Sequence, residues 1–346
     1  MNRKSFISSL LTSGAVLSAA DCWSAPPAPI SAAPAFMGRQ IIPPYLKPGN
    51  TIGITSPAGY IGLEEIRSSV ALMESWGFKV QVGQSIGKKD FTYGGTDTER
   101  AADLQQMLDD PQIGAVMCAR GGYGLVRIID QINFRSFVKH PKWVIGFSDV
   151  TVLHTHIHGN FNIATLHSKM CNSFPDDWAK AEPIQISTIL SVRQALTGED
   201  FKYTVPATTS NREGRGRGQL VGGNLSIIES VAGTVSDLNT EGKILFVEDT
   251  GEYLYTIDRM FWGLKRRGKL DRLAGLVIGG FKLKPDDSGE EFGKSIEQIV
   301  MEKVSEYNYP VCFDFPVGHQ RNNMALKCGV QHILEVGAGE SILRSI

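Results

Sequence analysis

Residues 142–151, KWVIGFSDVT, decide how this chain is expected to fold. A short apolar strand runs into Gly146 and Ser148, and a segment with helical spacing then continues to about His158. A serine at a sharp strand-to-helix turn projects its hydroxyl from the sheet edge, beside backbone N–H groups able to hold an oxyanion. Val150 replaces the second glycine of the full nucleophile motif, and a serine that only caps a helix would give the same pattern.

The segments around this turn alternate between short apolar and amphipathic patterns. We expect strands at 51–55, 78–82, 113–118 and 142–146, and helices at 64–76 and 97–108. This alternation predicts an α/β fold with a doubly wound, Rossmann- or flavodoxin-like parallel sheet. Because such sheets place their sites at the carboxyl ends of strands, the loop 120–124 and Ser148 should share one rim.

The composition favours two domains. The chain has 346 residues, of which 42% are hydrophobic, and a polar Gly/Arg-rich stretch at 206–218 is typical of a linker. We expect a nucleophile domain at 44–190, a linker at 191–218, and a smaller C-terminal α/β domain at 219–346. In that second domain we expect strands at 243–247, 275–280 and 309–313 and a helix at 256–267. The net charge of −1 provides no basic field for nucleic acid.

The first 43 residues have the pattern of a targeting segment. Arg3 and Lys4 precede an apolar stretch too short to span a membrane, which predicts a signal peptide at 1–25 and a flexible leader at 26–43. We therefore expect an exported, periplasmic protein without a transmembrane segment after cleavage. Cys22 is a candidate lipid anchor, although Asp21 is a poor residue before such a cysteine.

Two groups of residues invite a metal or disulfide interpretation. His154, His156 and His158 have metal-like spacing, but in a helix the middle residue points away from the other two, so we expect a partly exposed helix and no metal. None of the five cysteines forms a C-x-x-C pair. Cys312 and Cys328 could pair in an oxidising compartment, and isolated buried thiols are the more ordinary alternative.

A hydrolytic serine needs a base and an acid that orients it. His319 lies in a Gly/Pro loop just past a strand, where binding residues concentrate. Glu248 and Asp249 end the strand expected at 243–247, where a carboxylate can hold an imidazole or simply face solvent in a turn.

Five motifs in order resemble the LD-carboxypeptidase family of serine peptidases, the muramoyltetrapeptide carboxypeptidases. The resemblance covers nearly the whole chain after about Pro44. The motifs are CARGGYG at 118–124, GFSD at 146–149, GGNLS at 222–226, VED at 247–249 followed by Glu252, and Gly318-His319.

The resemblance implies a Ser–His–Glu triad in the cleft between the two domains. Ser148 would be the nucleophile, His319 the general base and Glu248 the orienting acid. The oxyanion would be held by the backbone N–H groups of Asp149 and Gly122.

The implied reaction removes the terminal D-Ala from peptidoglycan tetrapeptides during cell-wall recycling, without a cofactor. Arg120 and Asn224 are the candidate residues for binding this muropeptide, with Arg120 placed to hold its free carboxylate. The chain departs from the family pattern after His319 and at His167-Ser168-Lys169, which replaces a His-Gly-Pro stretch and alters the pocket walls.

Two other functions fit the same resemblance. One is a peptidase that inactivates peptidyl-nucleotide antibiotics, as the microcin-immunity branch does, and the other is a non-catalytic muropeptide-binding protein. A complete set of triad residues argues against the second, because a binding protein needs none of them. The sequence leaves open whether the protein forms a homodimer.

Overall fold

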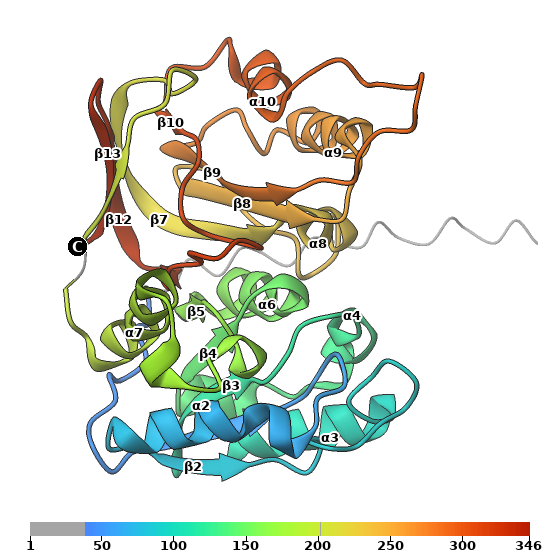
Figure 1. Cartoon of the computed structure of the whole chain (residues 1–346), viewed down its shortest axis with the longest axis vertical. Helices are drawn as coiled ribbons and strands as arrows, with labels where there is room; N and C mark the ends of the chain where they lie inside the picture. Colours follow the sequence, from blue (N-terminus) through green and yellow to red (C-terminus); the bar gives the residue numbers. More distant parts are fainter. Residues whose placement is uncertain (1–38, 201) are drawn as a thin grey trace, which may run out of the picture. The chain divides into compact units, whose positions relative to one another are not determined.

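The computed structural model describes residues 39–200 and 202–346, which form two sheets with their covering helices (Figure 1). The signal peptide expected at 1–25, Cys22 and most of the leader lie outside the described residues. In the described part of the chain, no helix combines the length and the apolar character needed to cross a membrane.

The first sheet is doubly wound, as the alternating pattern predicts. Its order is β11-β5-β4-β3-β1-β2, and every pair is parallel except β11 with β5. The order changes direction between β1 and β3, so the loops after these strands meet at the position where such sheets bind ligands. The strands are β1 (Thr51–Thr55), β2 (Lys79–Val82), β3 (Ile113–Cys118), β4 (Trp143–Gly146), β5 (Thr165–His167) and β11 (Leu326–Cys328).

Both faces of this sheet are buried, because alternate side chains of each strand enter different cores. In β3, Ala115 and Met117 pack on one face, and Val116 and Cys118 pack on the other. The first face is covered by α2 (Leu63–Ser75) and α7 (Pro183–Thr197). The second is covered by α3 (Asp97–Asp109), α4 (Leu125–Ile128), α5 (Arg135–Lys139) and α6 (Thr151–Phe161).

The second sheet is mixed, with the order β10-β9-β8-β7-β12-β13-β6. The run from β10 to β7 is parallel, and the strands beyond β7 are antiparallel. One face packs on α8 (Leu225–Ser230), α9 (Leu254–Arg266) and α10 (Ile296–Val304). The strands are β6 (Lys202–Pro206), β7 (Gly214–Asn224), β8 (Ile244–Thr250), β9 (Gly275–Lys282), β10 (Val311–Cys312), β12 (Gln331–Val336) and β13 (Glu340–Ser345).

The linker expected at 191–218 is largely regular structure. Its first part belongs to α7, and β6 and the start of β7 occupy much of the rest. The GRGRG run at 214–218 is part of β7 and pairs with β12. Arg215 lies opposite Glu335 of β12 and forms an ion pair with it at 3.0 Å. The alternate glycines permit close packing, because a Cβ on Gly216 would lie 1.7 Å from the carbonyl oxygen of Ala274.

The chain crosses between the sheets more than once. Strand β11, which follows His319 in sequence, joins the first sheet beside β5 rather than the second. The end of the expected leader is also structured, since Ile41 N–H donates to Asn162 O over 2.9 Å and Ile41 O accepts from Ala164 N–H over 2.8 Å. Both segments therefore extend the first sheet region beyond the expected range of 44–190.

Candidate active site

Ser148 lies at the turn between β4 and α6, in the short 3-10 helix η2 (Ser148–Val150). Its φ of 62° is left-handed, a conformation that costs a non-glycine residue about 1–3 kcal/mol and concentrates at functional sites. Gly146 permits the turn, because a Cβ there would lie 2.8 Å from a methyl carbon of Val150. Within residues 39–200 and 202–346 the Ser148 hydroxyl makes no hydrogen bond, so it does not act as a helix cap.

The glycine-rich loop 120–124 passes directly against Ser148. A Cβ on Gly121 would lie 3.1 Å from Ser148 Cβ and 3.3 Å from its Oγ. Gly59 N–H donates to Gly121 O over 2.8 Å, which joins the loops that follow β1 and β3. The backbone N–H groups of Gly122 and Asp149 have no acceptor among the described residues, so both are available to a ligand.

The side chain of Asp149 fastens this loop to the turn at Ser148, a contact that the sequence did not predict. It is fully buried, and its Oδ2 accepts from Leu125 N–H, at the start of α4, over 2.8 Å. Burial raises the pKa of the Asp149 carboxyl from 3.8 to about 6. The carboxylate thus fixes the relative positions of the two segments that carry the expected oxyanion donors.

Glu248 and His319 form a close pair. Glu248 lies on β8 and is fully buried, and its Oε2 lies 2.6 Å from His319 Nδ1 and accepts from His319 N–H over 3.1 Å. A carboxylate can only accept, so Nδ1 carries the ring proton and Nε2 is left free to act as a base. Gly318 allows this approach, because its φ is +102° and a Cβ would lie 2.4 Å from Glu248 Cβ.

The aromatic ring of Phe147 connects this pair to the turn at Ser148. Its centroid lies 4.8 Å from the centroid of the His319 ring, and Ser148 is the next residue in the chain. The structure therefore brings the three residues expected to form the triad to one region, where the rims of the two sheets meet.

Asp249 and Asn224 have structural contacts instead of facing His319. Asp249 Oδ2 accepts from Ser226 N–H at 2.8 Å and from its hydroxyl at 2.6 Å, while Asn224 Nδ2 donates to Oδ1 at 3.2 Å. Asn224 Oδ1 caps α8 through Ile227 N–H, and its own N–H donates to Thr151 Oγ1 over 3.0 Å. Both polar atoms of the Asn224 side chain are thus used in holding α8 in place.

Arg120 lies at the start of the glycine-rich loop 120–124, outside the Glu248–His319 pair. The Arg120 side chain is exposed and donates to Tyr60 O over 3.1 Å. It has no carboxylate partner among the described residues, which is the state that binding of a free carboxylate requires.

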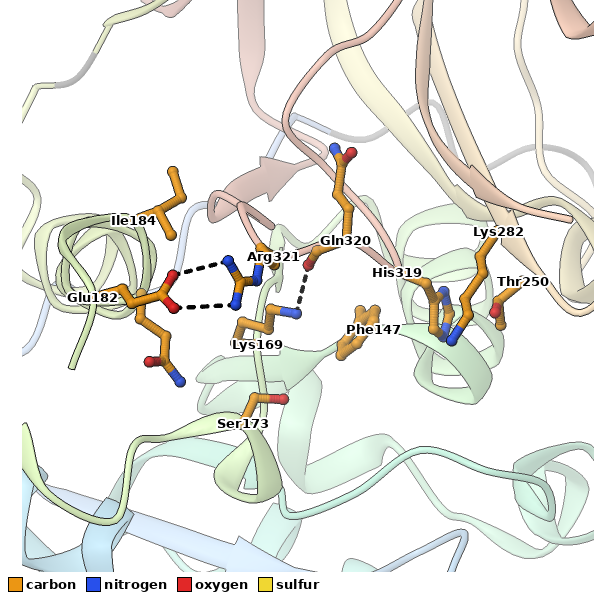
Figure 2. A pocket seen from close by; sticks show the side chains of 11 residues that line it. Phe147, Lys169, Ser173, Glu182, Ile184, Thr250, Lys282, His319, Gln320 and Arg321 are labelled. Carbon is orange, nitrogen blue, oxygen red and sulfur yellow. Dashed lines mark hydrogen bonds and ion pairs between the residues drawn. The ribbon is translucent and has the colours of Figure 1, made fainter. Parts of the chain in front are cut away.

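A pocket of about 570 Å³ opens beside His319 (Figure 2). Arg321 is already paired with Glu182, at 2.9 Å and 3.1 Å. Lys169 and Lys282 are not paired with an acid among the described residues. The lining residues are Phe147, Lys169, Ser173, Glu182, Ile184, Gln185, Thr250, Lys282, His319, Gln320 and Arg321. Sequence analysis named neither lysine as a site residue, although it placed Lys169 in the altered stretch at 167–169.

The histidine cluster on α6 is buried, and the expectation of a partly exposed helix is wrong. Each ring has its own partner: Gly146 O for His154 at 2.9 Å, Ser236 Oγ for His156 at 2.9 Å, and Lys243 Nζ for His158 at 3.1 Å. The helix is buried because it packs between the first sheet and β7. No group of metal-ligating side chains is found in the described part of the chain.

Cys312 and Cys328 are both buried as free thiols. Burial raises the pKa of each, to about 11 and about 12 respectively, so the reactive thiolate is disfavoured.

The comparisons with known proteins match both halves of the chain to one family. Residues 52–168 match the LD-carboxypeptidase N-terminal domain, and residues 217–334 match the LD-carboxypeptidase C-terminal domain. The probable murein peptide carboxypeptidase of Bacillus subtilis is 32% identical over 314 residues, covering 88% of this chain and 97% of the relative.

Solved structures share the fold. The muramoyltetrapeptide carboxypeptidase from Oxalobacter formigenes aligns with a TM-score of 0.75 and 25% identity, over 86% of this chain and 98% of that one. The structure of MccF in complex with glutamyl sulfamoyl guanosine aligns with a TM-score of 0.77 at 22% identity, over 88% of this chain and 98% of that one. With both domains matched in order along the chain, this protein belongs to the LD-carboxypeptidase family.

Proposed function

We propose that this protein is a serine carboxypeptidase that hydrolyses the L-D peptide bond releasing the terminal D-Ala of peptidoglycan tetrapeptides. The observation that carries the proposal is the buried Glu248–His319 pair, with Nδ1 and Oε2 2.6 Å apart, beside the strained Ser148 turn. Relatives whose names specify murein peptides supply the substrate class.

In the reaction, His319 Nε2 takes the hydroxyl proton of Ser148 as Oγ attacks the carbonyl carbon of the residue before D-Ala. The N–H groups of Gly122 and Asp149 stabilise the oxyanion, and Glu248 stabilises the imidazolium. When the intermediate collapses, His319 donates the proton to the leaving amine of D-Ala. A water molecule then repeats the sequence on the acyl-enzyme and returns Ser148.

The wider setting belongs to the same proposal. An exported protein with this activity would trim peptides in the periplasm as part of cell-wall turnover. Arg120 is the candidate for holding the free carboxylate of the substrate, because its guanidinium is exposed and forms no ion pair among the described residues.

A product assay with purified muropeptides tests the proposal. The full chain should release D-Ala from a tetrapeptide, Ser148→Ala should not, and Ser230→Ala, which changes an exposed serine on α8, should match the wild type. Binding without release by the wild type would support the non-catalytic alternative. Hydrolysis of an aminoacyl-sulfamoyl nucleotide in place of the tetrapeptide would support the antibiotic-inactivating one.

A further inference from the structure

Lys169 lies in the pocket beside His319, and the mechanism above gives it no role. Its Nζ donates to Gln320 O over 2.8 Å, one residue past the base. It also lies 5.5 Å from the centroid of the Phe147 ring, which itself contacts the His319 ring. Figure 2 shows Lys169 and Phe147 pointing into the pocket from the first domain, with Lys282 reaching in near His319 and Thr250.

The charges of this pocket are unbalanced. Glu182 is the acidic side chain in its lining, and Arg321 already occupies that carboxylate. Neither Lys169 nor Lys282 forms an ion pair within the described residues. The acidic charge acting on Lys169 is that of the buried Glu248, which already binds His319. Lys169 is half-buried, and burial lowers the pKa of its ammonium group, while the charge of Glu248 acts in the opposite direction and offsets part of that effect. An anionic ligand would offset the remainder of that effect.

The chemistry of the proposed reaction says which anion fits here. The leaving nitrogen must lie next to His319, because His319 returns the proton to it. In a C-terminal residue the carboxylate carbon is only two bonds from that nitrogen, about 2.5 Å away. A cation that recognises the free carboxylate must therefore border the space beside the base, as Lys169 does.

We propose that Lys169, assisted by Lys282, binds the terminal carboxylate of the leaving D-residue and so restricts the enzyme to carboxypeptidase cleavage. One ammonium hydrogen is used on Gln320 O, which leaves two donors for the ligand. Lys169 thereby takes the contact with the terminal carboxylate that the sequence suggested for Arg120. Arg120 lies on the loop of the expected oxyanion donors and remains available for a different substrate carboxylate. This inference rests on the proposed function for the identity of the ligand.

The test compares a tetrapeptide ending in D-Ala with the same peptide ending in D-alaninamide. We expect the wild-type kcat/KM to favour the acid by about 10²-fold, since losing one partner of a desolvated ion pair has an effect of this order. In Lys169→Met the ratio of acid to amide should fall toward one, whereas Lys169→Arg should keep most of it. Lys284→Met is the control, because Lys284 stacks on Tyr253 outside the pocket lining.

A lysine that only held the loop at Gln320 would give a different result. Both substrates would then lose activity together in Lys169→Met, the ratio would stay the same, and the inference would be overturned.

Calorimetric binding to Ser148→Ala separates this inference from the proposed function. If the wild type releases no D-Ala, the proposed function fails, but tighter binding of the acid than of the amide, lost in Ser148→Ala/Lys169→Met, still supports the subsite. Equal binding of acid and amide to Ser148→Ala would refute the subsite even in an active enzyme.

Discussion

Replacing Asp149 with asparagine should stabilise the protein at neutral pH and change how its stability depends on pH. The carboxyl is fully buried next to Ser148, and desolvation raises its pKa from 3.8 to about 6. The hydrogen bond from Leu125 and the charge of Arg100 offset only part of that effect. Because the folded protein holds this proton more tightly than the unfolded chain, ionisation of Asp149 lowers the free energy of unfolding.

The size of the effect follows from the two pKa values. Their difference, from 3.8 to about 6, corresponds to about 3 kcal/mol of stabilisation of the folded protein by the protonated carboxyl. This stabilisation is fully present below about pH 4 and is lost as the pH rises to about 6. Asparagine cannot ionise, and its Oδ1 can still accept from Leu125 N–H, although the charge assistance of that bond, about 1 kcal/mol, is lost. We therefore expect a net gain of about 1–2 kcal/mol at pH 7, equivalent to a rise in Tm of about 1–3 °C for a chain of 346 residues.

Denaturant titrations of wild type and Asp149→Asn between pH 4 and pH 7.5 measure this difference directly. The free energy of unfolding of Asp149→Asn should exceed that of the wild type by a margin that grows as the pH rises through this window. Asp287→Asn changes an exposed carboxylate in a surface loop and should follow the wild type throughout. If the Asp149→Asn curve runs parallel to the wild-type curve, the buried carboxylate is not the group that titrates, and the reasoning fails.

Three further predictions concern the reaction itself. Glu248→Gln should leave the fold intact and lower kcat by about 10⁴, because a neutral amide cannot stabilise the imidazolium of His319; near wild-type turnover in steady-state kinetics would contradict this role. Gly318→Ala should lower kcat/KM at least about 10²-fold, because the added Cβ would lie 2.4 Å from Glu248 Cβ. Gly289→Ala is the control and should retain activity, because Gly289 also has a positive φ of +81° but nothing lies within 4 Å of its added Cβ. D-Ala release should survive exhaustive chelation, because the three histidines of α6 each bind a different partner; loss with EDTA and recovery with zinc would refute a metal-independent serine mechanism.

The first sheet could be predicted well from sequence, because its signals are local. Strands at 113–118 and 143–146 are short, mainly apolar runs, and α3 carries a capping box at Thr96 and Glu99 that marks its start. The carboxyl ends of these strands fix where Ser148 and the glycine loop must lie. Parallel-sheet geometry then places them on one rim without further information.

The second sheet was harder to predict, because the glycine-rich composition of its strand β7 at 214–218 shows no alternation of apolar and polar residues. The glycines of 214–218 are needed because the backbone near Ala274 presses on that face of β7. This contact joins residues more than 50 positions apart, so no neighbouring residue indicates why the glycines are there. Judged by its composition alone, the run therefore resembles a flexible linker. The same limit applies to His158, whose partner Lys243 comes from the other half of the chain.

The geometry of the site depends on contacts that join the two sheets. Ser148 belongs to the first sheet and Glu248 to the second, so a shift of about 1 Å between them would cost activity about 10²-fold. Asn224 N–H donates to Thr151 Oγ1 over 3.0 Å, which ties the second sheet to the helix that follows Ser148. Lys169 Nζ bonds the His319 loop over 2.8 Å, and β11 then carries that loop into the first sheet beside β5. His319 is therefore held from both sides, by the Glu248 carboxylate of the second sheet and by contacts of its loop with the sheet that carries Ser148.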